Sequence, residues 1–61
     1  MKIVKLTDSQ FYFETDDHEG SIMDWKQLLS TLDDIAPFSD TDIGELITEL
    51  ASYKNGATKN L

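Results

Sequence analysis

Alternating apolar and polar positions at the start of the chain predict a β-hairpin. Residues 2–7 and 10–15 have the pattern of two strands joined by a turn at Asp8 and Ser9. The register that this turn implies gives one face with Val4, Leu6, Phe11 and Phe13 and a second face with Ile3, Lys5, Tyr12 and Glu14. A shift by one residue would mix the two sets, so the pattern itself selects this register. We expect the first face, which is wholly apolar, to point into the core.

A polar turn over residues 16–20 and a short third strand over residues 21–23 lead into the first predicted helix. Asp24 is its expected N-cap, and Gln27 is placed three residues later to complete a capping box. Apolar side chains then follow at helical spacing, namely Trp25, Leu28, Leu29, Leu32 and Ile35. Pro37 predicts that the helix ends near Ile35 or Ala36, because the residue before a proline avoids helical backbone.

The second predicted helix begins with the same pattern. Ser39 is its expected N-cap, Asp42 is the partner three residues later, and Phe38 is placed to pack against Ile43. The apolar stripe of this helix consists of Ile43, Leu46, Ile47, Leu50 and Ala51. Gly56 predicts the end of the helix, and residues 57–61 are expected to form a disordered tail.

These elements predict an α+β fold, in which a small antiparallel β-hairpin or three-stranded sheet is followed by two α-helices packed on one face. The length of 61 residues predicts a single compact domain over residues 1–56. The absence of cysteine excludes a disulfide framework and a thiolate metal site. The short apolar stretches at the amino terminus and elsewhere predict neither a signal peptide nor a membrane span, so we expect a cytoplasmic protein.

The distribution of charge is the most unusual feature of the sequence. All twelve acidic residues lie between Asp8 and Glu49 with one base, Lys26, so this segment carries −11 within a chain of net charge −7. The other four lysines lie near the two ends, and the chain has no arginine. Such a charge repels nucleic acid and membranes and attracts basic protein surfaces. We therefore expect no direct contact with nucleic acid or a membrane.

Catalytic, metal and cofactor sites are not indicated by the sequence. The chain has one histidine, His18, and no cysteine, and no serine has an identifiable base beside it. The turn over residues 16–19 holds carboxylates and an imidazole, but four consecutive residues rarely converge on one ion. The segment from residue 40 resembles a calcium loop only faintly, since Gly44 and Ala51 occupy the wrong positions. We expect no enzyme, no metal and no cofactor.

Carboxylates on one side of the second helix suggest a binding face. Asp42, Glu45 and Glu49 are spaced three and four residues apart, so they share one side. Carboxylates four residues apart rise by about 6 Å along a helix, which is near the spacing of phosphates along one nucleic-acid strand. A solvated acidic face is the alternative explanation of this stripe. In size and charge the chain resembles small acidic proteins of phages and mobile elements that disable host defence nucleases.

Two functions remain open from the sequence. The first is an inhibitor that mimics nucleic acid and blocks a basic, nucleic-acid-binding enzyme. Its expected contact residues are Asp16, Asp17, Glu19, Asp33, Asp34, Asp42, Glu45 and Glu49. The second is an adaptor or accessory module, which contacts a partner protein through Tyr12 and Ile3 on the open face of the sheet while the acids provide solubility. The sequence also leaves a homodimer open, and an apolar seam left open by the dimer is then the alternative contact of the second function.

Overall fold

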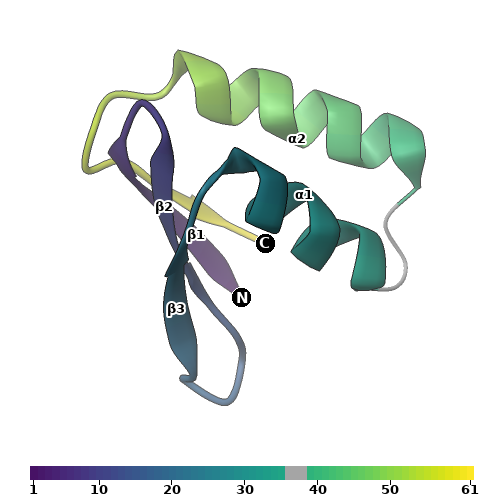
Figure 1. Cartoon of the computed structure of the whole chain (residues 1–61), viewed down its shortest axis with the longest axis horizontal. Helices are drawn as coiled ribbons and strands as arrows, with labels where there is room; N and C mark the ends of the chain where they lie inside the picture. The colour runs from purple at the N-terminus through teal and green to yellow at the C-terminus, as the bar shows by residue number, and fades with distance from the viewer. Residues whose placement is uncertain (36–38) are drawn as a thin grey trace.

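The protein has an α+β fold, as the sequence predicts, and its computed structural model describes residues 1–35 and 39–61. Three strands, β1 (Lys2–Thr7), β2 (Gln10–Glu14) and β3 (Gly20–Met23), precede two helices, α1 (Trp25–Asp34) and α2 (Asp40–Ser52). A last strand, β4 (Thr58–Asn60), completes an antiparallel sheet of order β3-β2-β1-β4. Both helices lie on the same face of this sheet (Figure 1).

The hairpin turn at Asp8 and Ser9 is where the sequence predicts it, but the predicted register of β1 is wrong. Thr7 pairs with Gln10 as expected, and beyond that point Lys5 pairs with Phe11, so that Leu6 forms a β-bulge. Because side chains alternate between the two faces of a strand, the extra residue exchanges the faces of the β1 residues that precede it. Ile3 and Lys5 therefore point toward the core, where the sequence pattern predicts Val4 and Leu6.

The buried environment of Lys5 explains why this register is stable. Its side chain is only 4% exposed, and its Nζ donates hydrogen bonds to the carbonyl oxygens of Ala51 and Tyr53, at 3.2 and 3.0 Å. These carbonyls lie at the carboxyl end of α2, where a helix leaves acceptors without partners and favours positive charge. The bulge thus places the lysine where its charge is satisfied and Ile3 where it is fully buried.

Both helices begin at the predicted capping boxes. The amide of Gln27 donates to Asp24 Oδ1 at 2.8 Å, and the Gln27 side chain accepts from the Asp24 amide at 3.1 Å. Ser39 and Asp42 exchange the same pair of bonds at the start of α2. The predicted roles of Ala36, Pro37 and Phe38 lie outside the described residues.

The carboxyl-terminal segment differs from the prediction. In place of the expected disordered tail over residues 57–61, Thr58–Asn60 forms the edge strand β4, which pairs with β1. Helix α2 ends at Ser52, one turn before the predicted stop, and Gly56 has a φ of 90° in the turn that leads into β4. Such a positive φ favours glycine. The amide of Leu61 donates to the carbonyl of Met1, so the two ends lie side by side (Figure 1).

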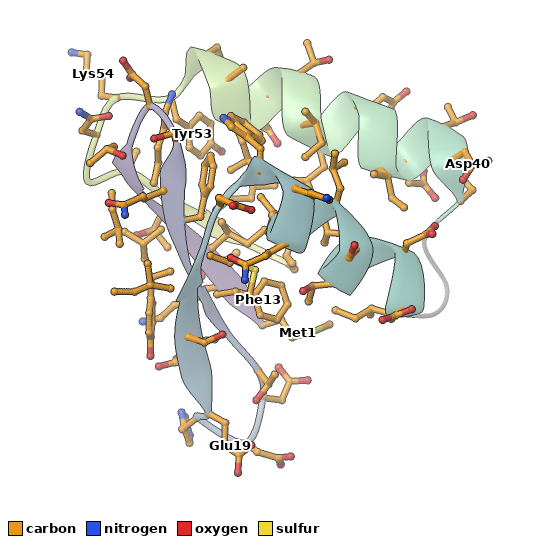
Figure 2. The ribbon with its side chains drawn as sticks, viewed as in Figure 1. Met1, Phe13, Glu19, Asp40, Tyr53 and Lys54 are labelled. Carbon is orange, nitrogen blue, oxygen red and sulfur yellow. The ribbon has the colours of Figure 1, made fainter. Side chains whose placement is uncertain are left out.

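The core lies between the sheet and the two helices. Figure 2 shows Phe13 in this layer, while Lys54 projects away from it. The buried apolar side chains are Ile3, Phe11, Phe13, Met23, Leu28, Leu32, Ile43, Leu46 and Leu50. The half-buried Trp25 packs edge-on against Phe11 with ring centroids 4.3 Å apart, and its indole N–H donates to the carbonyl of Asp8. Trp25 therefore joins the start of α1 to the hairpin turn.

Candidate protein-binding surface

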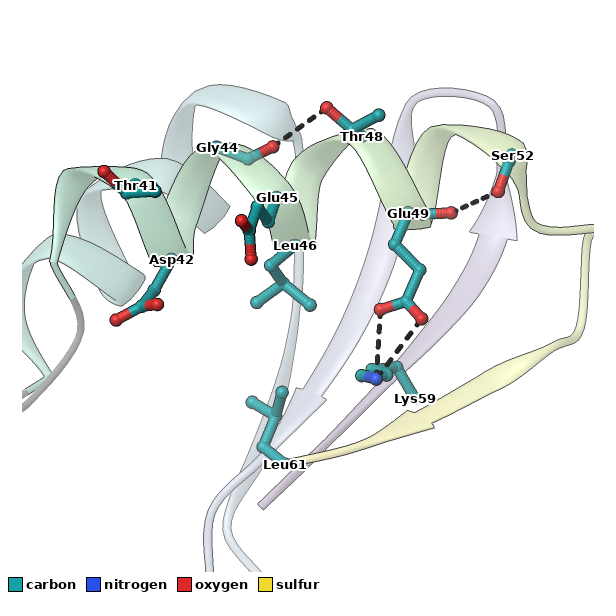
Figure 3. Close-up of a pocket in the computed structure, with 10 residues that line it drawn as sticks. All are labelled: Thr41, Asp42, Gly44, Glu45, Leu46, Thr48, Glu49, Ser52, Lys59 and Leu61. Atoms are coloured by element: carbon teal, nitrogen blue, oxygen red, sulfur yellow. Dashed lines mark hydrogen bonds and ion pairs between the residues drawn. The ribbon is translucent and has the colours of Figure 1, made fainter.

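A groove of about 1210 Å³ lies between α2 and β4, on the side of α2 that carries the predicted acidic stripe. Figure 3 shows the side chains that face one another across it, with Asp42, Glu45, Leu46 and Glu49 coming from α2 and Lys59 and Leu61 from the carboxyl-terminal segment. Helix and strand diverge toward the Asp42 end, so the groove opens at that end (Figure 3). The sequence-predicted stripe is therefore one wall of a groove.

The ion pair between Glu49 and Lys59 closes the narrow end of the groove. Lys59 Nζ lies 3.0 Å from Glu49 Oε2 and 3.3 Å from Oε1. The hydrogen bond to Glu49, together with its negative charge, raises the pKa of Lys59. The charge of Glu49 is thus compensated within the fold, and this carboxylate adds less to an acidic face than the sequence suggests.

The other two carboxylates of the stripe differ from Glu49. The Asp42 carboxylate accepts hydrogen bonds from the Ser39 amide and hydroxyl, so one of its oxygens is engaged in the helix cap. Glu45 is exposed. Within the described part of the chain, neither Asp42 nor Glu45 has a basic side chain within ion-pair distance.

Asp33 of α1 and Asp40 of α2 meet where α1 ends and α2 begins, and we call this surface the acidic end. We define it by these two residues and by the acids next to them along the two helices, namely Asp34, Asp42 and Glu45. Asp33 and Asp40 line the same small hollow of about 290 Å³, together with Leu29, Ser30 and Ile43. No ion pair within residues 1–35 and 39–61 involves any of the five carboxylates. The fold therefore brings together acids from two separate parts of the sequence.

Asp33 and Asp34 occupy an electrostatically unfavourable position. They lie in the last turn of α1, where the helix dipole favours positive charge, and that turn has no basic residue. Asp40 and Asp42 occupy the first turn of α2, where the dipole favours negative charge. Helix stability thus explains Asp40 and Asp42 but not Asp33 and Asp34.

The predicted acids of the β2–β3 turn lie apart from the acidic end. Figure 2 shows Glu19 at one extremity of the molecule and Asp40 at another. Asp16 forms an ion pair with the amino group of Met1, which lowers the pKa of the Asp16 carboxyl through a hydrogen bond and through its positive charge. Asp17 and Glu19 are exposed. The fold therefore divides the eight predicted acidic contact residues among separate surfaces.

The predicted apolar contact is partly wrong. Ile3 is 0% exposed, because the bulge at Leu6 turns it into the core, and it is not available on the outer face. Tyr12 does lie on that face, where its hydroxyl donates to Glu14 at 3.0 Å. Its cross-strand neighbour Ile22 is 63% exposed. The outer face of the sheet thus has an apolar pair, but the second member is Ile22.

Two residues that shape these surfaces were not predicted from the sequence. Lys59 lies in a segment without an apolar pattern, so nothing in the sequence indicated a strand there. For Ile22 the sequence predicts a short strand but not the face of the sheet on which the side chain lies. The pairing of Ile22 with Tyr12 could have been predicted only from the register of β2 with β3.

A metal site and a membrane-spanning helix were also sought among the described residues. Residues 1–35 and 39–61 contain no group of three or more histidine, aspartate or glutamate side chains placed to hold a metal ion. Neither of the helices described is both long enough and apolar enough to cross a membrane.

No protein-family model matches the chain, and comparison with curated proteins and with solved structures also finds no match.

Proposed function

We propose that the protein is a non-enzymatic inhibitor that binds the basic, nucleic-acid-binding surface of another protein through its acidic end. The observation that carries this proposal is the position of Asp33 and Asp34. These two carboxylates oppose the dipole of α1 and have no basic partner in the described chain, and Asp33 shares a hollow with Asp40 of α2. A binding role accounts for charges that helix stability does not explain.

The mode of binding follows from the charge. An acidic surface presented to a basic groove speeds association and makes the affinity strongly dependent on salt. The partner would lose access to nucleic acid, because the carboxylates occupy the positions of phosphates. Binding of duplex DNA and of this protein to the partner is therefore mutually exclusive.

The experiment is affinity capture from cells at low and high salt, followed by competition with duplex DNA on the purified partner. We expect a nucleic-acid-binding protein that high salt releases and that duplex DNA displaces. The double variant Asp33→Lys/Asp34→Lys should lose this partner. Asp17→Lys/Glu19→Lys is the matched control, because it changes the total charge equally on the distant turn. Simultaneous binding of the partner to DNA and to this protein would exclude mimicry.

A second function is favoured by one specific observation. Ile22 is 63% exposed beside Tyr12 on the face of the sheet away from the helices. An exposed apolar and aromatic pair suits an interaction module whose contact is insensitive to salt. In that case Ile22→Ser with Tyr12→Ala abolishes binding, while the Asp33→Lys/Asp34→Lys variant binds as the wild type does.

A further inference from the structure

We propose that the groove between α2 and β4 binds a basic amphipathic helix of a partner protein. This inference rests on the proposed function, which requires a partner of positive charge. It adds the site on this protein and the helical conformation of the partner segment. The groove is wide open and follows α2 from Thr41 to Ser52, nearly the whole length of the helix. This long, open shape suits a segment of polypeptide better than a small molecule, which is held in a concave pocket.

The groove combines apolar and acidic side chains in the way that such a helix requires. Leu61 is 38% exposed and faces the groove opposite Leu46, so its side chain provides an apolar contact that the fold leaves uncovered (Figure 3). Asp42 and Glu45 form the rim on the α2 side and have no ion pair in the described chain. A helix with apolar residues on one face and lysine or arginine beside them matches both features.

The position of Lys59 favours a helix over an added strand. Lys59 pairs with Ile3 across β1 and β4, so its side chain is on the core side of an edge strand. A charge that points inward from an edge strand opposes the addition of another strand, because the newcomer would bury it. Here the charge is held by Glu49 across the narrow end. The wide end near Asp42 and Leu61 remains open to a helix that lies along α2.

Three synthetic peptides test the proposal. The first is a helical-pattern peptide of about 18 residues, some 27 Å long when helical, made of leucine, alanine and lysine with leucine at positions i, i+3, i+4 and i+7. The second has the same composition with leucine and lysine alternating, a pattern that favours a strand. The third is oligolysine of equal charge. Fluorescence anisotropy gives the affinities, and NMR amide shifts give the location.

We expect the helical-pattern peptide to bind about tenfold more tightly than the other two and to shift the amides of Glu45, Leu46 and Leu61 rather than that of Ile22. Glu45→Lys should weaken this binding about tenfold, a difference of about 1.4 kcal/mol. The matched control, Glu19→Lys, should leave it nearly unchanged. Leu61→Ser should weaken it as well, while Ile22→Ser, which removes an exposed apolar side chain elsewhere, should not.

Other outcomes overturn the proposal in distinguishable ways. Equal binding of all three peptides, with Glu45→Lys and Glu19→Lys weakening it equally, would mean diffuse charge attraction; the groove proposal fails and the proposed function stands. Tighter binding of the alternating peptide would assign β4 to strand addition. Self-association that shifts the same amides would assign the groove to a second copy. Binding of none of the peptides at low salt would exclude the groove as a basic-helix site, and only capture of the partner tests the proposed function.

Discussion

Lys5 and Tyr53 are joined by a hydrogen bond of 3.0 Å from the buried ammonium group of the lysine to the carbonyl oxygen of Tyr53. The same group donates to the carbonyl of Ala51. A lysine from the first strand thus caps the carboxyl end of the second helix, 48 residues later in the chain. No basic residue lies in the last turn of α2 itself. The sheet therefore supplies the charge that the helix end lacks.

Replacing this lysine should destabilise the fold more than any other lysine substitution. Lys5→Met keeps the length of the side chain but removes both hydrogen bonds, so that two carbonyls lose a charged donor. We expect the free energy of unfolding to fall by about 1.5–3 kcal/mol, the usual value of hydrogen bonds to charged groups. Urea denaturation followed by tryptophan fluorescence measures this change.

Lys54→Met is the control, because Lys54 is exposed and projects away from the core (Figure 2). Its effect should stay within about 0.5 kcal/mol. Equal stability of the two variants would mean that the buried ammonium group contributes no more than an exposed one, and the capping role of Lys5 would be wrong.

The position of Lys5 could not be predicted from the sequence, although the elements around it could. The turn at Asp8 and Ser9 and both capping boxes follow from local patterns, and the structure confirms them. The bulge at Leu6 does not, because its reason is a tertiary contact between β1 and the end of α2. A lysine in an alternating pattern normally indicates the face exposed to solvent. Here the carbonyl oxygens of Ala51 and Tyr53 accept hydrogen bonds from Lys5 and hold it on the buried face.

The candidate surface was predictable to a similar extent. Helical spacing placed Asp42, Glu45 and Glu49 on one side of a helix, and Figure 3 shows them on one wall of the groove. The opposite wall could not be predicted, because β4 has three residues without an apolar pattern and forms only through pairing with β1. The meeting of Asp33 with Asp40 likewise depends on how the helices pack.

Gly20 leaves room for the Tyr12 ring, which lies over it. A Cβ atom built at Gly20 would lie 2.2 Å from the Tyr12 hydroxyl oxygen and 2.4 Å from Cζ, so the ring would have to move. We expect Gly20→Ala to lower the free energy of unfolding by about 1 kcal/mol, at the low end of overpacking costs, because the half-buried ring can move only by giving up its hydrogen bond to Glu14. In a Tyr12→Ala background the same substitution should cost nothing. A double-mutant cycle by urea denaturation measures the difference, and an equal cost in both backgrounds would contradict the contact.

The hydroxyl of Tyr12 should ionise at a higher pH than an ordinary tyrosine. The pKa of Tyr12 is raised above the ordinary value of 10.0. The largest cause is the hydrogen bond to Glu14, followed by desolvation and then by the negative charge of Glu14. Because the pKa is raised in the folded state, the stability from this hydrogen bond is fully present below pH 10.0 and is lost as the pH rises through the folded pKa.

Ultraviolet absorbance of tyrosinate measures this pKa directly in a Tyr53→Phe background, where Tyr12 is the remaining tyrosine. Adding Glu14→Gln removes the charge, so the pKa of Tyr12 should move down toward 10.0. Glu19→Gln is the control, since it removes an acid that has no bond to Tyr12. A titration unchanged by Glu14→Gln would show that the carboxylate does not control the ionisation.

The acids at the end of α1 should reduce stability while they support binding. Asp33→Lys/Asp34→Lys replaces two charges that oppose the helix dipole with two that favour it, so we expect the free energy of unfolding to rise by about 0.5–2 kcal/mol at low salt. Thermal denaturation at low and high salt measures the gain, which salt should reduce. Binding to the captured partner should fall in the same variant. A variant that gains stability and keeps full affinity would show that these carboxylates do not bind the partner. A variant that gains stability and loses affinity would show that Asp33 and Asp34 serve binding at a cost in stability.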